Sequence, residues 1–476
     1  MRRIAVLVVP LVAAMIAVST APPAGAAGRG GSKVPPNVDV SRRVGNESEE
    51  TIAVNPTDPQ NIVTVANVAE GVSGMFEGVS FDGGQTWKTS IIADEPNSSI
   101  GLGDSCCDPS LSFDEYGNLF LTYLYESEGT LPIALSTDGG LTFDLIANIS
   151  GVPKKAASLA AGTGERRGLF RFVDQPTITA GEGEVWAVDN VGGPIGAFGA
   201  RVTGLGQVGT FSGEVVPGTN NCTYGDVAIG PQGQVMQACN HNESGQGGGK
   251  IYESVDPDGL GPAGFAKARF VTATHVGGFD FIPAQQDRSI DAEVGLVWDR
   301  TDGPHGGRVY MVYTREHPNE SDNTDIYVRH SDDGGATWSG PTRVNDDTTT
   351  NSQFLPKISL DPTTGQIAVI WYDSRNDLGT GGAGDTNGVP NDDAQVWGAF
   401  SSDGVSFTSN IRISQGTSNS HDSGNHIDYG DYDGLSFFGG VAHPAWSDNT
   451  NSTGDNPDGA LHDLDIYTAG VSSPLR

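Results

Sequence analysis

Ser80-Phe81-Asp82-Gly83-Gly84-Gln85-Thr86-Trp87 is an eight-residue motif that recurs along this chain. It returns as Ser136-Thr137-Asp138-Gly139-Gly140-Leu141-Thr142-Phe143 and as Ser331-Asp332-Asp333-Gly334-Gly335-Ala336-Thr337-Trp338. A shortened copy, Ser401-Ser402-Asp403-Gly404-Val405-Ser406-Phe407, lacks one glycine. The pattern is typical of a tight turn, because Asp accepts nearby backbone N–H groups and Gly adopts positive φ. The repeat therefore predicts one supersecondary unit that is used several times.

Short strands with turn signals surround the motif. In each unit an entry strand begins near a Pro or an acidic residue, and a second strand ends near an aromatic residue. A third strand leads into the motif and a fourth leaves it. Four short strands per unit are typical of a β-propeller blade. We therefore predict an all-β fold with units near 49–93, 107–149, 172–216, 222–272, 287–345, 353–414 and 428–471.

The last unit shows only three strands, and Asn37–Ser41 at the N-terminus is a candidate for the fourth. Such a strand would join the two ends of the chain and remove an exposed sheet edge. We expect one β-propeller domain over 37–476, with seven four-stranded antiparallel blades and velcro closure by the N-terminal strand. Because the motif is degenerate in the third and fourth units, a six-bladed ring is the alternative.

The eight-residue motif is the Asp-box, and the chain resembles the secreted BNR-repeat, sialidase-like proteins. Sialidases hold the sugar carboxylate with an arginine triad and use a Tyr nucleophile paired with Glu, together with an Asp acid/base. The place of their Arg-Ile-Pro signature reads Ser41-Arg42-Arg43-Val44-Gly45 here, without the Ile-Pro. Tyr432 with Glu50 or Glu293 is the nearest match to the Tyr–Glu pair. The resemblance implies a secreted sialidase-like glycoside hydrolase acting on exposed glycan ends. A non-catalytic extracellular propeller that binds glycan or protein is the alternative.

The acidic composition limits the partners. The 476 residues include 26 Lys+Arg and 59 Asp+Glu, for a formal net charge of −33. Such a surface repels phosphate backbones, so a nucleic-acid partner is not expected. The expected partner is a glycan or glycoconjugate, and the protein is expected to be a monomer.

The first residues have the pattern of a targeting signal. Arg2 and Arg3 precede an apolar run from Ile4 to Val18, and Ala24-Gly25-Ala26 offers a small-residue cleavage site. We interpret 1–26 as a signal peptide and 27–36 as a flexible N-terminus, so the protein is predicted to be secreted and extracellular. No later stretch approaches the roughly 20 apolar residues that a membrane span needs.

Export makes disulfides permissible for the four cysteines. Cys222 and Cys239 flank an apparent hairpin, which favours a local bridge between them. The adjacent Cys106 and Cys107 would then form a vicinal bridge. In the alternative, one of those two reaches Cys222 instead, because sequence does not fix connectivity.

The candidate site lies on the face opposite the Asp-boxes, where the entry strands begin at the central channel. One acidic residue stands near the start of almost every entry strand: Glu50, Asp108, Asp174, Asp226, Asp291 and Asp431. We predict a ligand site, with catalytic roles, built from Asp108, Asp174, Asp226 and Asp431 together with Arg171 and Arg288. Crowded carboxylates raise some pKa values and thus supply a general acid beside an ionised partner. The alternative interpretation is that each carboxylate caps backbone N–H groups and each arginine makes a surface salt bridge.

Two further features extend this hypothesis. Arg375 follows a second strand and is a candidate to complete a cationic clamp, since Arg binds carboxylates bidentately. No cofactor is required by any motif, but Ca²⁺ is a candidate, because crowded carboxylates bind hard cations. The loop 377–393, with Asp377, Asp385, Asp392 and Asp393 among glycines, is one place for it.

Overall fold

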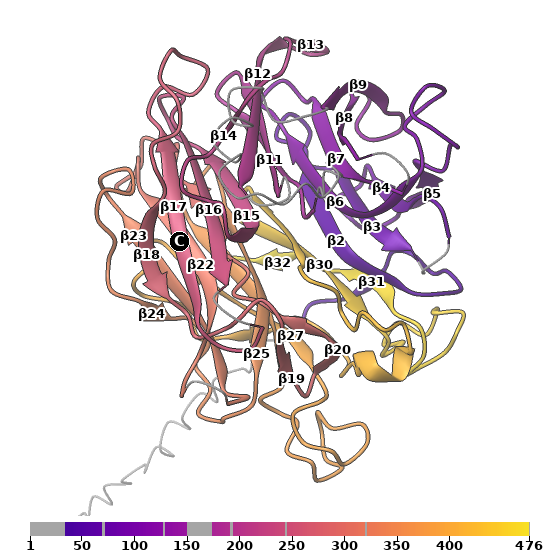
Figure 1. Ribbon diagram of the computed structural model, residues 1–476. Helices are drawn as coiled ribbons and strands as arrows, with labels where there is room; N and C mark the ends of the chain where they lie inside the picture. The colour runs from indigo at the N-terminus through magenta and orange to yellow at the C-terminus, as the bar shows by residue number, and fades with distance from the viewer. Residues whose placement is uncertain are drawn as a thin grey trace, which may run out of the picture. The chain divides into compact units, whose positions relative to one another are not determined.

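The computed structural model describes residues 34–68, 72–126, 129–149, 174–190, 194–242, 245–318 and 321–475. Within these ranges the chain consists of β-strands and one short 3₁₀ helix, η1 (Ser420–Ser423). The strands form seven antiparallel sheets of four or more strands and one separate hairpin (Figure 1). No helix in the described part is long and apolar enough to cross a membrane. The predicted signal peptide, 1–26, lies outside the described residues.

The first three blades follow one another along the chain, each running from the channel outward. Blade 1 comprises β2 (Glu47–Val54), β3 (Ile62–Val68), β4 (Met75–Ser80) and β5 (Lys88–Ile92); blade 2 comprises β6 (Ser105–Phe113), β7 (Leu119–Tyr125), β8 (Leu131–Ser136) and β9 (Asp144–Ile149). Blade 3 comprises β10 (Thr177–Gly181), β11 (Glu184–Asn190), β12 (Ile195–Gly204) and β14 (Ser212–Val215), with the two-residue β13 (Gln207–Val208) also on β12.

Blades 4 to 6 repeat this order. Blade 4 comprises β15 (Cys222–Ile229), β16 (Val235–Asn242), β17 (Gly249–Asp256) and β18 (Arg269–Ala273); blade 5 comprises β21 (Gly295–Trp298), β22 (Val309–Glu316), β23 (Thr324–Ser331) and β24 (Thr342–Arg343). Blade 6 comprises β25 (Gln353–Leu360), β26 (Ile367–Asp373), β27 (Gln395–Ser401) and β28 (Ile411–Arg412).

The last blade joins the two ends of the propeller. It contains β29 (Gly434–Phe438), β30 (Val441–Asp448) and β31 (Asp465–Thr468), with β32 (Val471–Ser472) also on β30. Its outer strand is β1 (Val38–Asp39), which pairs with β31 through Val38↔Thr468 and Asp39↔Tyr467. The velcro closure is therefore confirmed.

The innermost strands of the blades form a closed ring. Each contacts the next in the order β2, β6, β10, β15, β21, β25 and β29, and β29 returns to β2. The seven-blade prediction is thus confirmed and the six-bladed alternative is wrong. The second strands are largely buried, as in β7, whose seven residues are all buried. A strand covered by neighbouring blades on both faces has no polar face to present.

The Asp-boxes make the turns that the sequence predicts. Asp82 accepts hydrogen bonds from the backbone N–H of Thr86 at 2.8 Å and from its hydroxyl at 2.6 Å. Ser80 Oγ donates to Asp82 at 2.9 Å and accepts the N–H of Gly84 at 2.9 Å. Gly83 and Gly84 both have positive φ, 72° and 84°, which explains the paired glycines.

One segment differs from the predicted blade pattern. The sequence places the start of the fifth unit at 287, but Gln285–Ile290 forms β20, which pairs with β19 (Asp280–Ile282) in a separate hairpin. The backbone groups of β20 bond within that hairpin, so the inner strand of blade 5 begins only at Gly295. The hairpin carries Arg288 to the channel mouth.

Candidate functional site

The entry strands begin on the face of the propeller opposite the Asp-boxes. In blade 1, β2 starts at Glu47 opposite Val68, at the far end from Ile62, which pairs with Ser80 of the Asp-box. Blade 2 has the same arrangement. The starts of β2 and β6 and the residues just before β10 therefore lie at one mouth of the channel, as predicted.

A backbone irregularity recurs in these strands. Glu49, Asp108 and Gln175 adopt positive φ, at 54°, 58° and 46°. The pairing register shifts at the first two, between Ser48 and Thr51 and between Cys107 and Ser110. A non-glycine residue in this region costs about 1–3 kcal/mol, and such residues cluster at functional sites. Three of them meet at this mouth.

Arg288 and Asp431 form the ion pair at the centre of the site. The Nε of Arg288 donates to Asp431 Oδ1 at 2.7 Å, and its Nη2 donates to Oδ2. Asp428 fixes the hairpin behind this pair, because its Oδ2 accepts the backbone N–H groups of Asp287 at 2.8 Å and of Arg288 at 3.0 Å. In the described part of the chain Nη1 of Arg288 has no hydrogen-bond partner, so one donor is available to a ligand.

Polar contacts link four blades around this pair. Gln175 donates its backbone N–H to Asp108 Oδ2 at 3.2 Å and its Nε2 to Asp431 Oδ2 at 3.0 Å. Asp431 in turn donates its N–H to Glu49 Oε1 at 3.0 Å. Asn67 donates to the other oxygen of Glu49 and accepts the N–H of Asp108 at 2.9 Å. The acids therefore belong to one connected network.

Burial and crowding raise the pKa of several of these carboxyls. Burial, followed by the charge of Asp431, raises the pKa of Asp108 to about 6. Burial, followed by the charges of Asp108 and Asp431, raises the pKa of Asp174 to about 7, while Arg288 opposes the shift. Burial is also the main reason that the pKa of Asp291 rises to about 7. Asp174 is only half-buried, so this proton is accessible.

Asp226 stands apart from the other predicted acids. Its Oδ2 accepts the N–H of Leu296 in the next blade at 2.6 Å, and its Oδ1 accepts the N–H of Val227 at 2.8 Å. Burial raises its pKa, and the charge of Lys357 opposes that rise. No hydrogen bond or ion pair within the described ranges joins Asp226 to Asp431. Asp226 therefore agrees with the alternative interpretation, in which the carboxylate caps backbone N–H groups. Its bond to Leu296 joins blade 4 to blade 5.

A narrow cavity continues down the channel below the mouth. Tyr432 and Glu50, one of the two candidate matches to a sialidase Tyr–Glu pair, both line it, together with Asp433 and Lys357. Glu50 is fully buried and accepts the hydroxyl of Ser447 at 2.8 Å. Burial raises the pKa of Glu50 to about 7.

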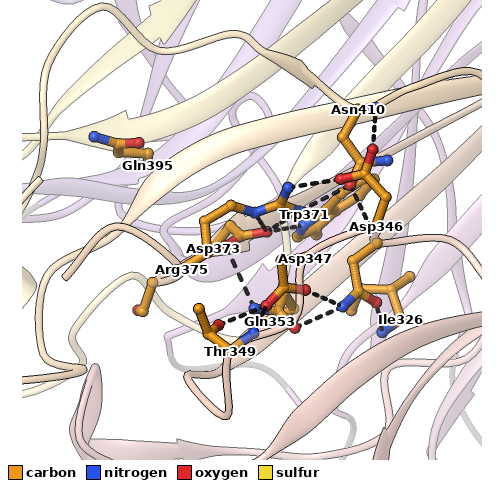
Figure 2. A network of polar contacts seen from close by, with 12 residues as sticks. Ile326, Asp346, Asp347, Thr349, Gln353, Trp371, Asp373, Arg375, Gln395 and Asn410 are labelled. Atoms are coloured by element: carbon orange, nitrogen blue, oxygen red, sulfur yellow. Dashed lines mark hydrogen bonds and ion pairs between the residues drawn. The ribbon is translucent and has the colours of Figure 1, made fainter. Parts of the chain in front are cut away.

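The two remaining predicted arginines differ in what can be said of them. Arg171 lies outside the described residues and stays a prediction. Arg375 is held in blade 6, as Figure 2 shows: its Nη2 donates to Asp373 at 2.7 Å and its Nη1 to Asp346 at 2.8 Å. Its guanidinium carbon also lies 4.3 Å from the centre of the Trp397 ring. Arg375 is thus a structural residue, not part of a clamp at the mouth.

Sequence reasoning missed Glu49, Gln175 and Asn67. Gln175 precedes Pro176 as Asp108 precedes Pro109, so the shared X-Pro step would have aligned Gln175, not Asp174, with Asp108. The sequence pattern indicates Glu50 and not Glu49, because it does not reveal the bulge in β2 that shifts the alternation of side chains by one residue. Asn67, at the end of a second strand, carries no sequence signal.

Both predicted disulfides are present. Cys106–Cys107 stands immediately before Asp108, and Cys222–Cys239 joins β15 to β16. The alternative, a bridge from Cys107 or Cys106 to Cys222, is therefore wrong.

One family model matches a short part of the chain. A family model described as the BNR/Asp-box repeat matches residues 79–89, which contain the first copy of the motif. The protein is an Asp-box β-propeller. No curated protein sequence matches this propeller.

Solved structures similar to the propeller include three with low sequence identity. A protein of unknown function from Dyadobacter fermentans is 11% identical, with 92% of this chain and 98% of that chain covered and a TM-score of 0.47. A mutant of the NanB sialidase from Streptococcus pneumoniae is 10% identical, with 72% and 67% covered and a TM-score of 0.47. The α-L-arabinofuranosidase Arb93A from Fusarium graminearum is 14% identical, with 71% and 93% covered and a TM-score of 0.43.

Proposed function

We propose that this propeller is a secreted glycoside hydrolase that acts on the end of a glycan held at the channel mouth. The observation that carries the proposal is the environment of Asp174. Its carboxyl is half-buried beside Asp108 and Asp431, and burial with their charges raises its pKa to about 7. It therefore holds a proton near neutral pH while remaining open to a ligand.

This arrangement suits glycosidic bond cleavage. Glycosidases pair a carboxylic acid of raised pKa with a second, ionised carboxylate across the scissile bond. Asp174 is the proposed general acid, which donates its proton to the leaving oxygen. Asp431, held as an ion pair with Arg288, is the proposed carboxylate that stabilises positive charge on the sugar ring. Asp108 raises the pKa of Asp174 and acts as a positioning residue.

The charge of the mouth favours an uncharged terminal sugar. Arg288 is the arginine that faces this acidic network among the described residues, and Asp431 already engages two of its nitrogens. Among the described residues a sugar carboxylate would therefore meet carboxyl groups and one arginine instead of an arginine triad. Hydroxyl groups of a neutral sugar can instead accept from Nη1 of Arg288 and donate to the carboxylates.

One observation favours the non-catalytic alternative. Asp108 and Asp431 both accept hydrogen bonds from Gln175, so the same acids also fasten neighbouring blades together. In a propeller that only binds glycans, this network would hold the shape of the channel mouth and would have no catalytic role.

A panel of aryl glycosides tests the proposal. It contains neutral pentosides and hexosides and one sialoside, with glycan binding measured in parallel by calorimetry. We expect aglycone release from at least one neutral glycoside. Release from the sialoside alone would contradict the substrate class, and binding without release from any glycoside would favour the binding module.

A further inference from the structure

The loop between β26 and β27 gathers four aspartates, none of which belongs to the proposed hydrolase site. One carboxylate oxygen from each of Asp377, Asp385 and Asp393 lies within 4.8 Å of the other two. Two oxygens bound to one Ca²⁺, each at about 2.4 Å, are at most about 4.8 Å apart. A single ion can therefore reach all three side chains.

A second observation comes from the fourth aspartate. Asp392 is 5% exposed, and its Oδ1 is buried without a hydrogen-bond partner. Its carboxyl lies beside that of Asp377 and is repelled by the charge of Asp393. A buried carboxylate oxygen without a partner costs free energy unless a cation or proton satisfies it. Among the described residues no ion pair supplies a cation to any of the four acids.

Backbone N–H groups of the loop hold two of these carboxylates in place. Asp377 Oδ2 accepts the N–H groups of Asp392 at 2.8 Å and Asp393 at 2.9 Å. Asp385 accepts those of Gly381 at 2.7 Å and Gly388 at 2.6 Å. A carboxylate offers about four lone-pair sites on its two oxygens, so these bonds hold the side chains in place and still leave lone pairs for a metal.

We propose that the loop 377–393 binds one Ca²⁺ through Asp377, Asp385 and Asp393, with Asp392 completing the acidic shell. An all-oxygen ligand set suits Ca²⁺ or Mg²⁺ better than zinc, whose structural sites are built mainly from His and Cys. A glycine-rich loop gives Ca²⁺ the flexible, high coordination it accepts, whereas Mg²⁺ demands a strict octahedron.

The ion would also steady the rim of the channel mouth. Asp393 Oδ1 accepts Nδ2 of Asn419 at 3.0 Å. Asn419 caps η1, and the same interblade segment continues to Asp428, which holds the backbone of Arg288. The calcium site thus connects to the hairpin that carries Arg288.

Calorimetric titration of the chelator-treated full chain with Ca²⁺ tests this proposal. We expect one ion per chain for the wild type, much weaker binding of Mg²⁺, and at least tenfold weaker Ca²⁺ binding for Asp385→Asn and Asp377→Asn. Asp422→Asn, which removes the same charge from an exposed position in the neighbouring segment, should bind like the wild type.

Two outcomes would overturn the proposal: no Ca²⁺ binding by the wild type, or unchanged affinity in Asp385→Asn. If the buried Asp377→Asn fails to fold, the half-exposed Asp385→Asn still decides the question. Proteolysis of the loop in wild-type protein is a second readout, and Ca²⁺ should slow it several-fold. Equal cleavage with and without Ca²⁺ would also count against the site.

Discussion

At the channel mouth Arg288 opposes the rise in the pKa values of its acidic neighbours. Its charge lowers the pKa of Asp108, Asp174 and Asp291, while burial and the other carboxylates raise them. The same guanidinium anchors Asp431. Removing this one arginine should therefore raise the pKa of each of these acids further.

Arg288→Gln should raise the pKa of Asp174 further, because a positive charge that favoured the ionised form is removed. We expect the alkaline limb of the pH–rate profile, where the general acid loses its proton, to move up by about half a unit to one unit. Arg269→Gln, which breaks an ion pair with Glu253 in blade 4, serves as the control and should leave the limb in place. A downward shift in Arg288→Gln would contradict this assignment.

At the scale of elements, the Asp-box turns depend on one buried hydroxyl. Ser401 is fully buried, accepts the N–H of Gly404 at 2.8 Å and donates to Asp403 at 3.1 Å. Ser401→Ala should cost about 1–2 kcal/mol of unfolding free energy, since buried backbone groups lose their partner. Its neighbour Ser402 is exposed, so Ser402→Ala should change stability by less than about 0.5 kcal/mol. Denaturant unfolding measures both, and equal costs would show that the hydroxyl is unimportant.

These turns also explain what could be predicted from the sequence. The motif fixes a local conformation, and its repetition with four strands per unit predicts the propeller, the seven blades and the closing strand. The site depends on features with weaker signals. The bulge at Glu49 moves the functional side chain by one residue, and the hairpin of β19 and β20 brings Arg288 across from its own blade. The bulge and the position of the hairpin both depend on how neighbouring blades pack against each other.

At the scale of the whole molecule, closing the ring buries many carboxyls. Burial raises the pKa of Glu50, Glu77, Asp174, Glu253 and Asp291 to about 7 in each case. In the unfolded chain such groups titrate near pH 4. Between these values the folded protein binds more protons than the unfolded one, so its stability falls as pH rises. Asp-box acids act in the opposite direction at lower pH: local hydrogen bonds lower the pKa of Asp82 to about 2.

We therefore expect maximal stability near pH 4–5, with Tm several degrees higher at about pH 5 than at about pH 7.5 when chelator is present. Glu77→Gln should reduce this difference in Tm, because it removes one buried acid whose pKa burial raises to about 7. Glu77 lies outside the mouth, and its side chain receives one hydrogen bond, from Ser90 at 2.7 Å. Scanning calorimetry across this range checks the sign. A Tm that rises from pH 5 to 7.5 would contradict the protonation of these buried acids.

The central claim is that Asp174 donates a proton to a glycan at the channel mouth, and kcat/KM of Asp174→Asn tests it most directly. The substrates are the best neutral glycoside of the panel and its analogue with a poorer leaving group. We expect a loss of about 100-fold or more, larger for the poorer leaving group, with Tm within a few degrees of the wild type. A variant that hydrolyses both substrates at the wild-type rate would contradict the account.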